Sequence, residues 1–215
     1  LQGAPTIAVT GGTGFLGVPT VRALVGRGVK TLVLSRRIPP AAERVAGAVY
    51  RSVDLGRPDA LEELPESVHT VIHAAAETVG GWEAHERNSV QATRNLVNGM
   101  ARRQIRQLVY VSSIAVVSKD AAEPITSASP TEGDPRSRGA YVWGKLRGEQ
   151  EALALGSELG VEVKIVRPSA LVDATDFSPP GKLGRALGPA FVAIGPKRSP
   201  LAIVDVGLAG EVLSW

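Results

Sequence analysis

The glycine-rich stretch TGGTGFLG, residues 10–17, restricts the possible folds of this chain more than any other feature. It follows the apolar residues 7–9 and leads into a helix-compatible segment, residues 18–24. A short β-branched strand, a glycine cluster and a helix start together let backbone N–H groups and the positive end of the helix dipole face a diphosphate. The stretch therefore predicts a nucleotide-binding turn, with a purely structural strand-to-helix turn as the alternative.

The amino-acid composition argues against several classes of binding partner. The 215 residues, 44% of them hydrophobic, suffice for one sizeable core. The 24 basic and 21 acidic residues are interspersed, so we expect no nucleic-acid partner. With no cysteine, and no carboxylate at ligand spacing from the three histidines, we expect no metal site. No apolar run approaches the roughly 18 to 20 residues that cross a bilayer, so we expect a cytoplasmic protein without a membrane partner.

Strand-like and helix-like segments alternate along the chain. After the first apolar segment, further strands are predicted at 31–34, 48–53, 68–73, 107–112 and 161–166. Helices are predicted at 18–27, 82–102 and 141–155. This alternation predicts an α/β fold: a doubly wound parallel sheet with strand order 3-2-1-4-5-6 and a partial C-terminal substrate cap. Ligands of such sheets bind at the carboxyl ends of the strands.

The end of the second expected strand indicates which dinucleotide would bind. Folds that bind NAD usually place an acidic residue there, which holds the ribose 2′-hydroxyl. This chain has Arg36 and Arg37 instead, and guanidinium groups can pair with a 2′-phosphate. We therefore expect NADP, with NAD less favoured and a solvated arginine pair as the alternative interpretation.

Several motifs together resemble the extended branch of the short-chain dehydrogenase/reductase superfamily, the epimerase/dehydratase-like Rossmann proteins. The motifs are Gly11-x-x-Gly14-x-x-Gly17, HAAA at 73–76, VYVSS at 109–113 and YVWGK at 141–145, in the order that the family uses. Gly144 departs from the family pattern, which often has serine or another small polar residue before the lysine. The resemblance covers nearly the whole chain.

The resemblance implies a set of cofactor-binding residues. They are Gly11, Thr13, Gly14, Phe15, Leu16, Gly17, Arg36, Arg37, Asp54, Leu55, Ala74, Ala75, Ala76, Asn88, Tyr141, Lys145 and Pro168. Asp54 would accept a hydrogen bond from the adenine amino group or, alternatively, cap the segment 58–64. Asn88 would support the active site by bonding backbone, or would only pack. We expect His73 to be a packed strand residue.

The resemblance also implies a catalytic trio, Ser113, Tyr141 and Lys145. Residues four apart share one face of a helix, so the phenol and the ammonium can point at the same atom. A phenol ordinarily has a pKa of about 10, and a neighbouring cation stabilises the phenolate. In the expected reduction NADPH gives hydride to a carbonyl carbon, while Tyr141 gives a proton to the oxygen and Ser113 polarises it. Lys145 would also hold the nicotinamide ribose.

These features predict an NADP-dependent oxidoreductase acting on a small carbonyl or secondary-alcohol substrate. Two alternatives stay open: a nucleotide-sugar epimerase or dehydratase, and a dinucleotide-binding sensor or assembly subunit without catalysis. We expect residues 1–170 to form the dinucleotide-binding domain and residues 171–215 a partial substrate-binding region. The chain begins at Leu1 rather than methionine, so we expect a trimmed or partial sequence. A homodimer would use the helices at 82–102 and 141–155.

Overall fold

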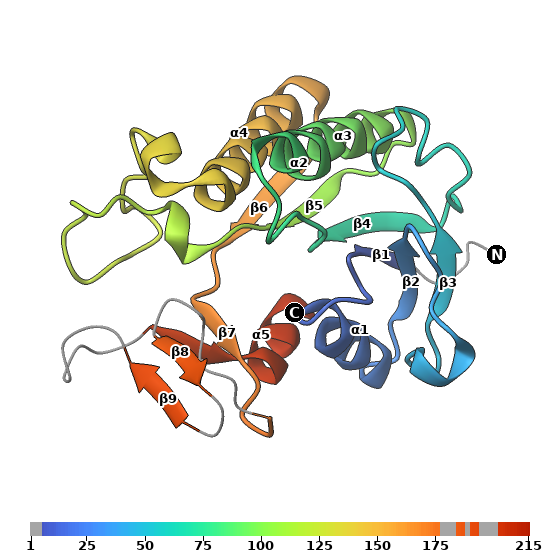
Figure 1. Cartoon of the computed structure of the whole chain (residues 1–215). Coiled ribbons are helices and arrows are strands. Elements are labelled where there is room, and N and C mark those ends of the chain that lie inside the picture. Colours follow the sequence, from blue (N-terminus) through green and yellow to red (C-terminus); the bar gives the residue numbers. More distant parts are fainter. Residues whose placement is uncertain (1–5, 177–183, 188–189, 194–201) are drawn as a thin grey trace.

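A parallel sheet forms the centre of the computed structural model, which describes residues 6–176, 184–187, 190–193 and 202–215. The strands follow the order β3-β2-β1-β4-β5-β6, which confirms the predicted topology (Figure 1). Their bounds are β1 (Thr6–Thr10), β2 (Lys30–Ser35), β3 (Val49–Ser52), β4 (Val68–His73), β5 (Gln107–Val111) and β6 (Glu162–Val166). All neighbouring pairs are parallel, so the carboxyl ends of these strands lie along one edge of the sheet.

Helices cover both faces of this sheet (Figure 1). One face carries α2 (Trp82–His85), the π-helical segment η2 (Glu86–Gln91), α3 (Ala92–Arg102) and α4 (Ala140–Leu159). The other face carries α1 (Gly17–Gly26) and α5 (Val206–Leu213). Short 3₁₀ turns lie between these elements, at η1 (Ala41–Glu43), η3 (Ile114–Val116) and η4 (Pro135–Arg138).

The central strands β1, β2, β4 and β5 are largely apolar because both of their faces are buried, whereas β3 and β6 lie at the edges of the sheet and are partly exposed. Successive side chains of a strand point to opposite faces. Ala8 of β1 therefore packs into the core that includes Leu96 of α3, and its neighbour Val9 packs into the core that includes Leu24 of α1. All four side chains are fully buried. The sheet is thus held between two separate apolar cores, one on each face.

Beyond β6 the chain forms small elements. The strand β7 (Ala170–Val172) pairs in parallel with β10 (Ile203–Asp205), and β8 (Gly184–Leu187) pairs antiparallel with β9 (Ala190–Ala193). The helix α5 packs against α1 so closely that a Cβ on Gly210 would lie 2.7 Å from the carbonyl carbon of Pro19. The predicted domain boundary at residue 170 stays a prediction. Within the region 171–215, residues 177–183, 188–189 and 194–201 lie outside the described residues.

Candidate active site

A cavity of about 880 Å³ lies at the carboxyl ends of the central strands. Its lining includes Gly14 from the turn after β1, Asp54 after β3 and Ala75 after β4. Ser113, after β5, and Tyr141, in the first turn of α4, line it as well. A cavity of this size is typical of small-molecule and cofactor sites. The strands of the sheet thus bring residues from distant parts of the sequence to one hollow.

The residues predicted to hold a cofactor line this cavity, with one exception. They are Gly11, Thr13, Gly14, Phe15, Leu16, Gly17, Arg36, Asp54, Leu55, Ala74, Ala75, Ala76, Asn88, Tyr141, Lys145 and Pro168. The exception is Arg37, which is exposed and is not part of the lining. Its carbonyl oxygen accepts a hydrogen bond from Ser35 Oγ at 2.8 Å, and this bond curls the chain after β2. Only Arg36 of the predicted pair therefore reaches the cavity.

The turn after β1 is packed tightly around its glycines. Gly11 has a φ of 68°, and a Cβ there would lie 2.6 Å from the nitrogen of Ala75. A Cβ on Gly17 would lie 2.0 Å from the carbonyl oxygen of Gly11. The first turn of α1 carries no acidic residue, so its N-terminus would not repel an anion. This turn fits the diphosphate of a dinucleotide, which needs close backbone approach and a positive helix end.

A chain of buried hydrogen bonds ties β1 to β4 and α3 beneath the cavity. Thr93 Oγ1 donates to the carbonyl oxygen of Ser89 at 2.6 Å, so it accepts from His73 Nε2, 3.2 Å away. His73 Nδ1 is then the acceptor for Thr10 Oγ1 at 2.6 Å, and that hydroxyl accepts from the nitrogen of Ala75 at 3.3 Å. Burial lowers the pKa of His73 to about 3, which keeps the ring neutral. His73 is packed, as expected, and also orients the strand ends.

The predicted catalytic trio comes from α4 and the end of β5. Lys145 is buried, and its Nζ donates to the carbonyl oxygen of Val111 at 2.9 Å. Burial lowers the pKa of Lys145 to about 8, so the ammonium remains mostly charged at neutral pH. Ser113 Oγ accepts a hydrogen bond from the nitrogen of Ala115 at 3.2 Å, an arrangement that still lets the hydroxyl donate to a ligand. Tyr141 lines the same cavity one helical turn before Lys145.

Ser112, the residue directly before Ser113, is also part of this lining. Its side chain is buried, and its Oγ has no hydrogen-bond partner within the part of the chain that the structure describes. A buried hydroxyl without a partner costs about 1 to 3 kcal/mol, so native proteins rarely leave one unsatisfied. Ser112 is therefore the kind of group that a polar ligand in this cavity would satisfy.

Glu77 is another lining residue that sequence reasoning missed. Its Oε1 accepts from the backbone nitrogens of Thr78, Val79 and Gly80 at 3.0, 3.3 and 3.3 Å. Asn88 Nδ2 donates to its Oε2 at 2.9 Å. These hydrogen bonds, chiefly the one from Asn88, lower the pKa of Glu77 to about 2. The expectation that Asn88 bonds backbone needs correction, because its amide instead binds the carboxylate that organises the loop after β4.

A partly buried ion pair joins the catalytic helix to the loop after β6. Arg167 Nε donates to Glu149 Oε2 at 3.1 Å, and its Nη2 binds Oε1 of the same carboxylate. Glu149 lies one helical turn after Lys145 and is almost fully buried. The next residue after the arginine, Pro168, lines the cavity, and its carbonyl oxygen accepts from the nitrogen of Ile114 at 2.9 Å. The pair therefore sets the position of one cavity wall.

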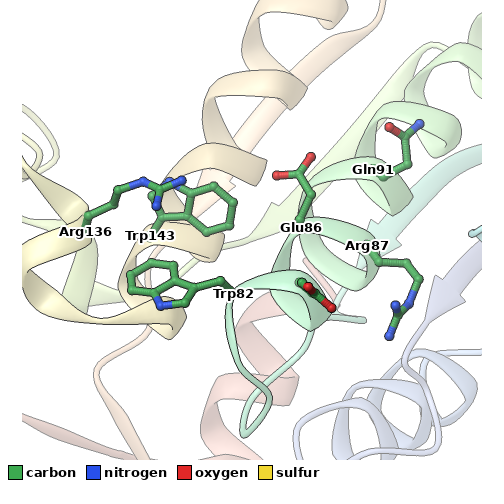
Figure 2. A pocket seen from close by; sticks show the side chains of 7 residues that line it. Trp82, Glu86, Arg87, Gln91, Arg136 and Trp143 are labelled. Carbon is green, nitrogen blue, oxygen red and sulfur yellow. The ribbon is translucent and has the colours of Figure 1, made fainter.

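A second hollow, of about 460 Å³, lies over α2, η2 and α4 and shares no lining residue with the first (Figure 2). Trp82 and Trp143 meet edge to face with ring centroids 5.7 Å apart, and the guanidinium of Arg136 lies 5.2 Å from each ring. In Figure 2, Glu86 and Arg87 lie apart from this aromatic group. The two tryptophan side chains thus connect α2 to α4 at this hollow.

Two features are absent from the part of the chain that the structure describes. None of the helices there combines the length and the apolar character that crossing a membrane requires. Within the same residues, no three histidine, aspartate or glutamate side chains gather in a way that could hold a metal ion.

The chain is similar to a family of known proteins and to several of its members. Residues 7–193 match the model of the NAD dependent epimerase/dehydratase family. The chain is 30% identical to sterol demethylase protein B of Methylococcus capsulatus, over 96% of this chain and 68% of that protein. It is 27% identical to cinnamoyl-CoA reductase 2 of Medicago truncatula, over 77% of this chain and 54% of that protein.

The fold is also similar to that of a solved enzyme structure, UDP-glucose 4-epimerase from Bifidobacterium longum in complex with NAD+ and UDP. The TM-score is 0.67 at 23% identity, covering 79% of this chain and 54% of that one. The chain spans about half to two thirds of the length of these three proteins. Since the family model matches most of the sequence, the chain belongs to the NAD dependent epimerase/dehydratase family, in the extended branch of the short-chain dehydrogenases/reductases.

Proposed function

We propose that this chain is the cofactor-binding and catalytic part of an NADP-dependent oxidoreductase that interconverts a carbonyl compound and a secondary alcohol. One observation carries the proposal: Ser113, Tyr141 and Lys145 line the same cavity as the glycine turn after β1. A nicotinamide cofactor bound there would supply or accept hydride at the substrate carbon. Membership of a family named for NAD dependence supports such a cofactor.

The chain's own residues would handle the proton and the charge. Tyr141 would give a proton to the carbonyl oxygen during reduction and take it back during oxidation. Ser113 would donate a hydrogen bond to the same oxygen and so stabilise its developing negative charge. Lys145, with its pKa of about 8, would keep a positive charge near the phenol at neutral pH. One of its three protons is used by the carbonyl oxygen of Val111, which orients the ammonium.

The choice of NADP rests on Arg36. It lines the cavity directly after β2, where NAD-binding folds usually carry a carboxylate. Asp54, on the neighbouring strand end, already accepts a hydrogen bond from the nitrogen of Gly56 at 2.9 Å. Its carboxylate would also accept from the adenine amino group, so the two residues would hold opposite ends of the adenosine 2′-phosphate unit.

Binding and turnover test the proposal separately. Titration should show tighter binding of NADPH than of NADH, and Arg36→Ala should remove most of that difference while Arg37→Ala should not. Against a panel of ketones, whose reduction gives secondary alcohols, the wild-type chain should consume NADPH. Tyr141→Phe should bind NADPH like the parent and lose turnover at least about 100-fold. Normal turnover by Tyr141→Phe, or equal affinity of the parent for both cofactors, would contradict the proposal.

An epimerase or dehydratase is the second candidate. It is supported by the family name and by the fold likeness to a UDP-glucose 4-epimerase. Such an enzyme would form product from a nucleotide sugar with no net change in cofactor, whereas a reductase consumes it in proportion to product. A sensor or assembly role without catalysis is less well supported, since the serine, the tyrosine and the lysine all line the cavity.

A further inference from the structure

The proposed chemistry leaves one buried imidazole beside Tyr141 without a role. His85, the last residue of α2, exposes 1% of its surface, and its Nδ1 has no hydrogen-bond partner within the described residues. Its ring meets the ring of Tyr141 almost at a right angle, at 80°, with centroids 6.2 Å apart. An edge-to-face pair of this kind favours one orientation of the phenol ring. His85 itself does not line the cavity, so it touches neither a substrate nor a cofactor there.

The space for this imidazole comes from Gly144, which lies between Tyr141 and Lys145 on α4. A Cβ at that position would lie 2.6 Å from His85 Nδ1, 2.9 Å from His85 Cβ and 3.0 Å from His85 Cγ. Non-bonded atoms do not approach so closely, because interiors are close-packed and overpacking forces neighbours to move. Any side chain at position 144 would therefore push the imidazole away from where it contacts the phenol. The departure from the family pattern at this glycine thus has a steric reason.

The helix that carries His85 is itself anchored on α4. Trp82, at the other end of α2, packs edge to face against Trp143, the residue directly before Gly144 (Figure 2). The backbone nitrogen of His85 donates to the carbonyl oxygen of Gly81 at 3.1 Å, which closes the single turn of α2. Because both ends of α2 contact α4, the imidazole is held on a fixed support.

We propose that His85 is a positioning residue for Tyr141 and that Gly144 is its matched partner. The imidazole fills the gap that the glycine leaves and sets the orientation of the phenol, whose hydroxyl acts in the cavity. Burial also lowers the pKa of His85, so the ring is a neutral packing partner rather than a second cation beside Lys145. The inference rests on the proposed function, because the orientation of Tyr141 affects turnover only if that residue transfers a proton.

A double-mutant cycle in the full chain tests the pair. Replacing a glycine by alanine inside a helix ordinarily raises stability. Gly144→Ala should instead lower Tm, and it should lower kcat about tenfold while the KM for NADPH stays within about twofold. His85→Ala should lower kcat by a similar factor. In the His85→Ala background, Gly144→Ala should cost less, because Nδ1 and Cγ of the imidazole are gone. Part of the cost should remain, because the Cβ of residue 85 would still lie 2.9 Å from the added methyl group.

A second readout needs no substrate. With ¹³C-labelled tyrosine, the Tyr141 ring signal is identified by its loss in Tyr141→Phe. It should shift in both His85→Ala and Gly144→Ala, while the Tyr50 signal, from β3, stays in place. The matched control His69→Ala replaces an exposed histidine of β4 and should move neither signal. If Gly144→Ala does not fold, His85→Ala, which only removes atoms, tests the proposal by itself.

The outcomes separate this inference from the proposed function. A Tyr141 signal that shifts in a protein without carbonyl-reducing activity would refute the proposed function and leave the packing claim intact. A Tyr141 signal unchanged in both variants would overturn the positioning role. So would independent effects of the two substitutions on kcat, or a Gly144→Ala variant with a raised Tm and unchanged kcat.

Discussion

The two ends of the large cavity are built in different ways. At the glycine turn the geometry comes from the backbone of one continuous segment, in which a Cβ on Gly17 would lie 2.0 Å from the carbonyl oxygen of Gly11. At the catalytic end the geometry comes from side chains that join distant segments, such as Arg167 on Glu149 and Asn88 on Glu77. The difference teaches that one end tolerates almost no added volume, whereas the other depends on charges and hydrogen bonds being matched.

Gly17→Ala should have the largest effect, because it adds a methyl group to the tightly packed glycine turn. The methyl group cannot be accommodated without moving the start of α1, so the free energy of unfolding should fall by roughly 4 kcal/mol or more and NADPH binding should be lost. Chemical denaturation and cofactor titration measure the two effects.

Gly26→Ala is the matched control in the same helix. A Cβ on Gly26 would meet nothing within 4 Å. This substitution should raise the free energy of unfolding by about 0.5 to 1 kcal/mol and leave NADPH affinity unchanged. Equal behaviour of the two alanine variants would remove the distinction between the ends of the cavity.

Arg167→Met tests the catalytic end of the cavity, where side chains hold distant segments together. It leaves the carboxylate of Glu149 buried and unpaired, which should lower the free energy of unfolding by about 3 to 5 kcal/mol. The loop that carries Pro168 should lose its anchor, so turnover should fall together with stability. Arg57→Met is the control, because Arg57 forms an exposed ion pair with Asp59. This substitution should leave the denaturation midpoint unchanged. A small loss of stability in both variants would show that the Arg167–Glu149 pair does not hold this wall of the cavity.

The same contrast explains how much the sequence alone could reveal. The strand order and the glycine turn could be predicted, because they depend on local apolar periodicity and on contiguous glycines. The trio Ser113, Tyr141 and Lys145 could be placed near one another, because a residue after a parallel strand and residues four apart on a helix have defined positions. Their catalytic roles stay predictions.

The remaining features depend on contacts that no local pattern encodes. Which of Arg36 and Arg37 faces the cavity depends on how the chain curls after β2. The pairing of Glu77 with Asn88 depends on how the loop after β4 folds against η2. The match of His85 with Gly144 appears only when α2 packs on α4. The sequence offered one signal for this contact, because Gly144 departs from the family pattern. The reason for that departure, the position of His85, lies elsewhere in the chain.

Lys145→Met tests whether the catalytic end is held at a cost in stability. Burial lowers the pKa of this lysine from 10.5 to about 8, so below pH 8 the native state carries a poorly solvated ammonium. Methionine should raise the free energy of unfolding at neutral pH by about 2 kcal/mol, after the lost bond to Val111 is allowed for, and should abolish turnover. Between pH 8 and 10.5 the parent should gain stability as pH rises, since the unfolded chain then binds more protons. Methionine should remove that gain.

The titration of His73 should give the smallest effect. His73 links the two ends of the cavity, since it bonds Thr10 at the start of the glycine turn and Thr93 of α3. Its pKa is about 3 in the folded chain, against an ordinary 6.5. Below pH 6.5 the imidazole is therefore protonated in the unfolded chain but stays neutral in the native state. Stability should fall by about 1.4 kcal/mol per pH unit, or about 2 kcal/mol by pH 5.

Denaturation from pH 7.5 to 5 measures this slope, and comparison with His73→Gln isolates it. The glutamine variant keeps groups that can donate and accept at this position but does not titrate, so its slope should be shallower. His85 also contributes, because burial lowers its pKa, and its share is present in both proteins. The pKa of Glu77 is lowered from 4.5 to about 2, so its contribution to stability is lost only as pH falls below about 4.5, outside this range. If the wild type and His73→Gln lost stability with the same slope, the pKa of His73 would not be lowered by folding. A neutral His73 ring would then not connect the two ends of the cavity.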